Sequence, residues 1–181
     1  MPLPADQIPE RARRVRLILL DVDGVLTDGT VDIHGAGGES KPFFIRDGLG
    51  MVWARRVGIE VGLLSGRPSE ATTRRAAELG LRIVSQGGHD KREAFATLLA
   101  THGFTTGDVA YMGDDLVDLP VLGQVGLSTA PADAVEDVRS RVHWVSRHPG
   151  GRGAVRELVE LVLSAQGRWA DIVDEHLVRE S

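Results

Sequence analysis

The sequence predicts an α/β protein of three layers, with a parallel sheet between two layers of helices. Short aliphatic runs alternate along the 181 residues with segments of helical apolar spacing. The apolar residues of each run are mostly consecutive rather than at every second position, which is typical of strands covered on both faces. Strands that alternate with helices join by right-handed crossovers into a parallel sheet. The predicted strands are 16–20, 60–64, 81–85, 108–112 and 124–128.

Helices are expected between and around these strands, all within one domain that covers residues 1–181. The leader, residues 1–15, is rich in arginine near its end, and Arg16 adjoins it. This pattern predicts a short helix with one solvated face. The tail, 167–181, is polar apart from scattered apolar residues, so a terminal helix and a frayed end both fit. The remaining predicted helices are 48–57, 68–79, 90–102, 115–122, 132–140 and 152–166.

Residues 30–45 interrupt this alternation and predict a protruding β-hairpin arm after the first strand. Val31 and Ile33 alternate with polar residues, and Gly-Ala-Gly-Gly follows to supply turn conformations. The segment is too short for a cap domain. An exposed apolar flank on such an arm favours a contact between subunits. The alternative is a hairpin folded onto its own sheet.

Composition narrows the possible functions. A net charge of −5 argues against a nucleic-acid binder, and the absence of cysteine excludes disulfides, thiolate zinc sites and a cysteine nucleophile. No apolar run approaches the roughly 18 residues of a membrane span, and the first residues do not resemble a secretory signal. We therefore expect a cytoplasmic protein that binds neither nucleic acid nor membrane.

Polar motifs follow three of the predicted strands: DVDG at 21–24, SGR at 65–67 and GDD at 113–115. The carboxyl ends of parallel strands share one edge of a sheet, so these motifs should meet around one pocket. Acids gathered there repel one another unless a cation lies between them. Oxygen ligands without cysteine or clustered histidine suit Mg²⁺, with Asp21 and Asp114 as carboxylate ligands and Asp23 through its main-chain oxygen.

The same residues predict phosphoryl transfer. Side chains alternate along an extended segment, so Asp21 and Asp23 lie on the same side and Val22 on the other. One carboxylate can then attack phosphorus while the other donates and accepts protons. Ser65 offers a hydroxyl to a phosphate oxygen and Lys91 a cation. Each motif alone is a weak signal, but their order along the chain is specific.

These residues carry a family resemblance. "LLDVDGVLTDG", "LLSGR", the lysine of "QGGHDK" and "YMGDDLVDLP" resemble the four signatures of the haloacid dehalogenase superfamily, in their usual order, across about residues 16–168. "FIRDGLGM" and "HPGGRGAVRELVELVLSAQGRW" resemble the branch that hydrolyses 3-deoxy-D-manno-octulosonate 8-phosphate, an eight-carbon keto sugar acid ester of lipopolysaccharide precursor synthesis. The resemblance implies a Rossmann-like fold without a cap domain.

The resemblance also implies roles for individual residues. Asp21 would be the nucleophile that forms an aspartyl-phosphate, and Asp23 the general acid and then base. Asp21, the Asp23 carbonyl and Asp114 would hold Mg²⁺. Arg75 equally fits an ordinary exposed helix face. The remaining implied residues are Asp115 and Asp118 as supports, and Arg46, Asp47, Gly48, Ser65, Gly66, Arg67, Arg75 and Lys91 around the substrate.

Family members of this kind are homotetramers whose hairpins build a shared barrel and whose neighbouring subunits close each site. The segment 148–157 resembles the tail that approaches an adjacent site, and it also predicts a glycine loop that caps the last helix. Two positions depart from the family: many relatives have a small polar residue in place of Phe44 and arginine in place of Val52. His89 and His148 lie near motifs, and we interpret them as surface or packing residues.

Three other functions remain open. A phosphatase for a nonulosonate 9-phosphate is less favoured, because that branch tends to carry an acid where Arg67 stands. A phospho-accepting receiver places its accepting aspartate on a later strand than the acidic pair. A non-catalytic assembly domain need not keep its acids, and here all are present.

Overall fold

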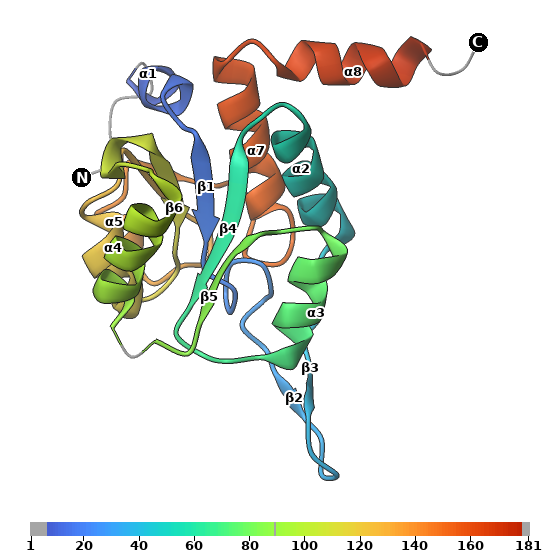
Figure 1. Cartoon of the computed structure of the whole chain (residues 1–181), viewed down its shortest axis with the longest axis vertical. Coiled ribbons are helices and arrows are strands. Elements are labelled where there is room, and N and C mark those ends of the chain that lie inside the picture. The colour runs from blue at the N-terminus through green and yellow to red at the C-terminus, as the bar shows by residue number, and fades with distance from the viewer. Residues whose placement is uncertain (1–6, 89, 179–181) are drawn as a thin grey trace.

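The computed structural model describes residues 7–88 and 90–178. They form a six-stranded parallel sheet in the order β5-β4-β1-β6-β7-β8 (Figure 1). The chain runs outward from β1 through β4 and β5, then returns to the other side of β1 for β6, β7 and β8. The strands are β1 Leu17–Leu20, β4 Glu60–Ser65, β5 Ile83–Gln86, β6 Val109–Met112, β7 Leu127–Ala130 and β8 Trp144–Val145.

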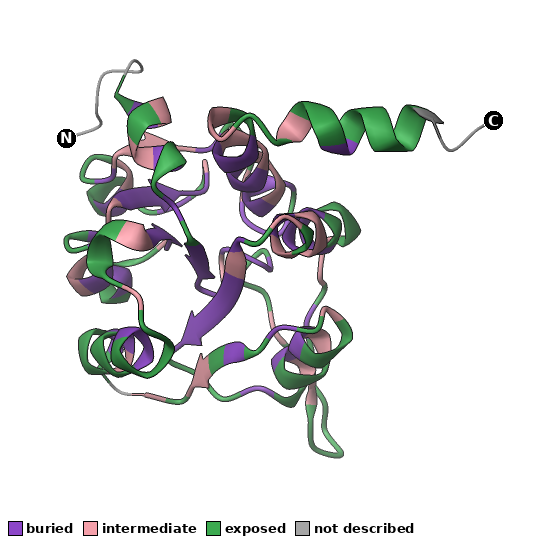
Figure 2. Cartoon of the chain, turned by 45° about the horizontal axis from the view of Figure 1, so that its top comes forward, coloured by how far each residue is buried: buried purple, intermediate pink, exposed green. Residues whose placement is uncertain are grey.

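Helices cover both faces of the sheet, as the sequence predicts. One layer contains α1, α2, α3, α7 and α8, and the other contains α4, α5 and α6. Figure 2 shows the inner strands of the sheet buried between them and exposed residues on the outer faces of the helices. The helices are α1 Ile8–Arg13, α2 Ile45–Arg56, α3 Glu70–Glu78, α4 Lys91–His102, α5 Leu119–Leu122, α6 Glu136–Arg139, α7 Ala154–Ala165 and α8 Trp169–Val178, with 3₁₀ turns η1 Thr106–Asp108 and η2 Leu116–Asp118.

The continuous apolarity of β1 has a direct structural reason. Ile18 and Leu20 point into the core beside α2 and α7, while Leu17 and Leu19 point into the core beside α4 and α5. All four side chains are fully buried. A strand with both faces covered is mostly apolar, and the first carboxylate after β1, Asp21, stands where the strand reaches the edge of the sheet.

Three predicted elements differ markedly from the structure, and one strand was not predicted. The strand expected at 124–128 begins at Leu127, because Gln124 closes a turn after α5 and Gly126 donates to the Thr106 carbonyl at 2.8 Å. The helix expected at 132–140 contains only the four residues of α6. The helix expected at 115–122 divides into η2 and α5, with a proline in the first turn of α5. β8 has two residues and was not predicted.

The predicted hairpin is present as β2 Asp32–Ile33 and β3 Glu39–Ser40, an antiparallel pair with its own two-stranded sheet. It projects away from the central sheet (Figure 1), so the alternative of a hairpin folded onto that sheet is wrong. Ile33 is 72% exposed on this arm. Across the described residues, the helices are all too short or too polar to cross a membrane.

Candidate active site

A pocket of about 620 Å³ lies at the carboxyl edge of the sheet, beyond β1, β4 and β6. This is the topological switch point, where the chain goes from one side of β1 to the other and where open α/β sheets bind ligands. Leu20 is in register with Met112, so Asp21 and Asp114 leave the sheet beyond the same level. The pocket is lined by Asp21, Asp23, Ser65, Gly66, Arg67, Gly88, Asp90, Lys91, Asp114, Asp115, Val117 and Pro120.

The loop after β1 is tightly wound. The amides of Val25, Leu26 and Thr27 all donate to the Val22 carbonyl oxygen, at 3.3, 2.9 and 3.0 Å. Gly24 has a φ of +89°, and a β-carbon there would lie 2.1 Å from an Asp114 carboxylate oxygen. Only glycine fits this position, which explains why glycine follows the two acids in the DVDG motif.

Three carboxylates lie close together at the base of the pocket. Asp21, Asp114 and Asp118 each place one oxygen so that the three atoms lie within 4.8 Å of one another. Burial, then the charge of Asp118, raises the pKa of Asp21 from 3.8 to about 6. Burial, then the charge of Asp21, raises the pKa of Asp114 from 3.8 to about 7. The cluster therefore holds negative charge at a cost that a bound cation would relieve.

Lys91 partly neutralises this cluster, at the start of α4. Its Nζ lies 2.8 Å from Asp21 Oδ2 and 2.7 Å from Asp118 Oδ1, and its side chain is 7% exposed. Burial lowers the pKa of Lys91, but the two carboxylates outweigh it and raise the pKa above its ordinary value. The lysine is therefore a fixed cation between two acids.

Asp118 supports the site from behind. Its Oδ1 accepts hydrogen bonds from Lys91 Nζ and from the Tyr111 hydroxyl at 2.6 Å. Its Oδ2 accepts from the amides of Asp114 and Asp115, at 3.0 and 3.2 Å. Both oxygens are thus already in use, and the fully buried side chain holds the loop that carries Asp114.

The donor set fits Mg²⁺. Asp21 and Asp114 supply carboxylate oxygens whose raised pKa values reflect an uncompensated cluster. The cluster contains only oxygen ligands, which suits a hard cation. Asp21 and Asp114 are the candidate carboxylate ligands, and the Asp23 main-chain oxygen is a candidate third.

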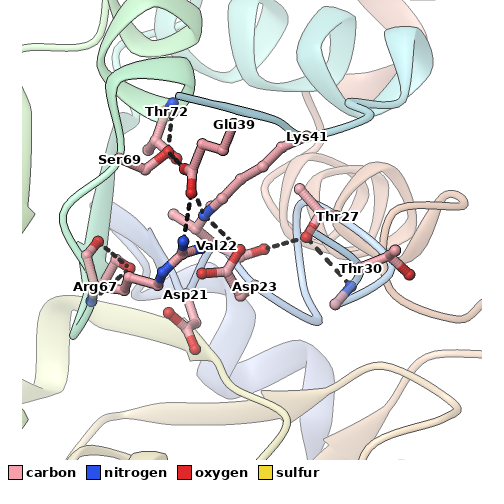
Figure 3. Close-up of polar contacts among 12 residues, drawn as sticks. Asp21, Val22, Asp23, Thr27, Thr30, Glu39, Lys41, Arg67, Ser69 and Thr72 are labelled. Atoms are coloured by element: carbon pink, nitrogen blue, oxygen red, sulfur yellow. Dashed lines mark hydrogen bonds and ion pairs between the residues drawn. The ribbon is translucent and has the colours of Figure 1, made fainter. Parts of the chain in front are cut away.

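Lys41 is a site residue that the sequence reasoning missed. Its side chain is fully buried, and its Nζ lies 2.6 Å from Asp23 Oδ1 (Figure 3). The chain contains only two lysines, Lys41 and Lys91, against 19 arginines. Both bind acids of the DVDG motif, so the rarity of lysine was a usable signal.

Ser65, Gly66 and Arg67 line the pocket, where the sequence reasoning expects them. Ser65 is buried, and its hydroxyl accepts from the Arg67 amide at 3.3 Å and donates to the Arg67 carbonyl at 3.1 Å. The Arg67 guanidinium pairs with Glu39 of β3 (Figure 3).

Asp47 does not reach the pocket of Asp21, although the sequence reasoning placed it beside the substrate. It is buried and accepts hydrogen bonds from the amides of Gly153 and Arg156, at 3.3 and 2.8 Å. Gly153 is the N-cap residue of α7 and has no side chain to cap the helix, and Arg156 lies in the first turn. Burial raises the pKa of Asp47 despite these bonds. Asp47 therefore caps α7.

Three more expected substrate residues lie outside that pocket within this chain. Arg46 lines a separate cavity of about 430 Å³ with Arg147, Arg152 and Arg156. Gly48 packs against Arg75, whose Nη2 would lie 2.2 Å from a β-carbon at Gly48. The Arg75 guanidinium pairs with Glu78 and stacks over the Phe43 ring.

The remaining residues singled out in the sequence make contacts within their own loops and helices. Asp115 lines the pocket, and its side chain accepts from the Leu116 amide at 2.6 Å at the start of η2. Phe44 precedes α2 as its N-cap residue without a side-chain cap, so a polar residue there would cap the helix. Val52 is half-buried within α2, and His148 is exposed. His89 lies outside the described residues.

The segment 149–153 packs against the DVDG loop of its own chain. A β-carbon at Gly150 would lie 1.8 Å from the Gly24 carbonyl oxygen. The Gly151 amide donates to the Val25 carbonyl at 2.8 Å, and the Gly150 amide donates to Asp133 at 2.9 Å. The glycines thus allow two backbones to touch behind the site.

Comparison with known proteins gives close relatives, although no family model matches the chain. The 3-deoxy-D-manno-octulosonate 8-phosphate phosphatase of Escherichia coli strain K12 is 45% identical over 167 residues, which cover 92% of this chain and 88% of that protein.

Two solved structures of proteins with the same name are also similar. That of Yersinia pestis has a TM-score of 0.90 at 43% identity and covers 92% of this chain and 90% of that one. That of Moraxella catarrhalis, in complex with magnesium, phosphate and the KDO molecule, has a TM-score of 0.93 at 34% identity and covers 96% of this chain and 99% of that one.

Proposed function

This chain belongs to the 3-deoxy-D-manno-octulosonate 8-phosphate phosphatase family, and we propose that it hydrolyses this sugar acid phosphate with Asp21 as nucleophile. The observation that carries the proposal is the cluster of Asp21, Asp114 and Asp118 oxygens at the carboxyl edge of a sheet that matches a magnesium-bound family member. Magnesium is the cofactor that this oxygen cluster fits.

The first step transfers the phosphoryl group to Asp21. A carboxylate oxygen of Asp21 attacks phosphorus, and the bond from phosphorus to the sugar oxygen breaks. Asp23 gives its proton to that leaving oxygen, which becomes the free hydroxyl of the sugar acid. Lys91 and the Ser65 hydroxyl bind the non-bridging oxygens, and bound magnesium supplies further positive charge against the charge on the transferred group.

The second step releases phosphate. Asp23, now ionised, takes a proton from a water molecule as the water oxygen attacks phosphorus of the aspartyl-phosphate. The bond between phosphorus and Asp21 breaks, which returns Asp21 to a carboxylate and gives inorganic phosphate. Asp118 keeps Lys91 and the Asp114 loop in place through both steps.

The decisive experiment is a panel of substrates with purified protein, in Mg²⁺ and in EDTA. We expect the octulosonate 8-phosphate to have the highest kcat/KM, and EDTA to remove the activity. A higher kcat/KM for a nonulosonate 9-phosphate would overturn the choice of substrate. Failure to turn over any phosphate ester in Mg²⁺ would overturn the reaction class.

We further propose that the chain forms a homotetramer and serves lipopolysaccharide precursor synthesis. The pocket is open, since the 43 residues between Asp21 and Ser65 hold the short arm, α2 and most of β4 but no cap domain. The exposed Ile33 of the arm is an apolar surface that a neighbouring subunit would cover. Arg46 and the cations of its cavity would then be available to a neighbour's substrate.

A further inference from the structure

Lys41 follows β3 directly, at the base of the protruding arm, and reaches the site from outside the sheet. Its Nζ lies 2.6 Å from Asp23 Oδ1 and 3.9 Å from Glu39 Oε1, with the side chain fully buried (Figure 3). A buried ammonium is costly unless it is paired, so its position depends on these two acids. The Asp23 side chain remains 27% exposed toward solvent.

Glu39 is itself held in place. Its Oε1 accepts from the Ser69 hydroxyl at 2.5 Å, and its Oε2 pairs with Arg67. The hydrogen bond from Ser69, with the nearby charges of Lys41 and Arg67, lowers the pKa of Glu39. The base of the arm is therefore tied to β4 and α3 by bonds that converge on one ionised carboxylate.

We propose that Lys41 is a positioning residue for Asp23, an inference that rests on the proposed function. Its ammonium occupies Asp23 Oδ1, while Oδ2 has no hydrogen-bond partner among the described residues. The proton that Asp23 gives to the leaving sugar oxygen is then carried on Oδ2. When that O–H bond breaks, the new carboxylate is already paired with a cation that holds its orientation for the second step.

The test compares two leaving groups. A sugar alkoxide needs the proton from Asp23, whereas p-nitrophenolate leaves without one. Moreover, kcat/KM includes only the steps up to loss of the leaving group, so the later hydrolysis does not enter. We expect Lys41→Met and Lys41→Gln to lower kcat/KM for octulosonate 8-phosphate about 10–100-fold and for p-nitrophenyl phosphate by less than about 3-fold.

The ratio of the two kcat/KM values also separates positioning from folding. A variant that folds poorly loses both activities by the same factor, which leaves the ratio unchanged. Arg82→Met is the matched control, because Arg82 makes an exposed pair with Glu60 at 2.8 Å, and it should leave both activities unchanged. In an Asp23→Asn background, Lys41→Met should not lower the ratio further.

Equal losses on both substrates, no loss on either, or a further fall in the ratio when Asp23 is already Asn would each overturn the assignment of Lys41. The proposed function is judged separately, on the wild-type protein. Wild-type turnover of both esters that Asp21→Asn abolishes supports the phosphatase mechanism, whatever the Lys41 variants do.

Discussion

The ammonium of Lys91 lies 2.8 Å from Asp21 Oδ2, and both side chains are more than nine-tenths buried. This pairing aims the Asp21 carboxylate and helps to keep it ionised although burial opposes its charge. An amide at position 21 keeps an acceptor for Lys91 but cannot attack phosphorus.

Asp21→Asn should therefore lower kcat by more than about 10⁴-fold, as loss of other catalytic nucleophiles does, while the chain stays folded. Phosphate release and thermal unfolding measure the two effects. Asp171→Asn on the exposed side of α8 is the matched control. A near-normal kcat in Asp21→Asn would reject Asp21 as the nucleophile.

Magnesium should stabilise the protein more at high pH than at low pH. The folded chain raises the pKa of Asp21 to about 6 and that of Asp114 to about 7, above 3.8 in both cases. These groups contribute stability that is fully present below pH 3.8 and is lost as the pH rises through 6 and 7. Mg²⁺ binds the deprotonated cluster, so its effect on Tm should be larger at about pH 8 than at about pH 5.

Thermal unfolding in Mg²⁺ and in EDTA at several pH values gives this measurement. Asp114→Asn removes one acid, so it should raise Tm in EDTA at about pH 8 and weaken the response to Mg²⁺. A magnesium effect that does not change with pH would contradict the assignment of Asp21 and Asp114 as ligands.

Gly150→Ala should distort the DVDG loop of the site. The added β-carbon would meet the Gly24 carbonyl oxygen, so the DVDG loop or the segment 149–153 must shift. We expect a loss of about 1–3 kcal/mol in the free energy of unfolding and a lower kcat. Gly35→Ala is the control, since nothing lies within 4 Å of a β-carbon there. Equal behaviour of the two variants would show that the contact with Gly24 is unimportant.

Asp47→Ala should cost stability rather than catalysis. It removes the carboxylate that accepts the Gly153 and Arg156 amides, and loss of a helix cap costs about 1–2 kcal/mol. Urea unfolding measures the loss, and kcat/KM of the folded protein should change little. A large rise in KM at unchanged stability would restore Asp47 to the substrate side, where the family resemblance placed it.

Ile33→Asp should weaken subunit assembly. Ile33 is 72% exposed on the arm, and an acid there could not be buried in an interface. Light scattering after size-exclusion chromatography should show a tetramer for the unchanged chain and smaller species for the variant. Val173→Asp, at a half-exposed position of α8, is the control. A monomeric unchanged chain would contradict the tetramer.

The sheet and the edge that bears the pocket were predictable because their signals are local. Strands covered on both faces are mostly apolar, and the acids that follow β1 and β6 interrupt that pattern visibly. β8 has two residues, too few for any period to appear. Val125 continues the apolar run before β7, but it lies between a turn that Gln124 closes after α5 and Gly126, whose amide donates to the distant Thr106 carbonyl.

The contributions of Asp47 and Lys41 were not predictable from local sequence. Asp47 stands in a motif-like "RDG", yet its partners are amides more than 100 residues away along the chain. Lys41 contacts Asp23 because the arm returns to the carboxyl end of β1, and no periodic pattern in the sequence predicts this path of the chain. Such long-range pairs depend on topology, whereas the motif aspartates depend mainly on where strands end.

The contact between Gly150 and Gly24 also bears on how the enzyme matures during translation. The DVDG loop leaves the ribosome before the backbone that packs against it, which is synthesised more than 120 residues later. A nascent chain can thus assemble β1, β4 and β6 while its acids still lack their rear support. Catalytic competence should arise late and abruptly, when the segment 149–153 docks.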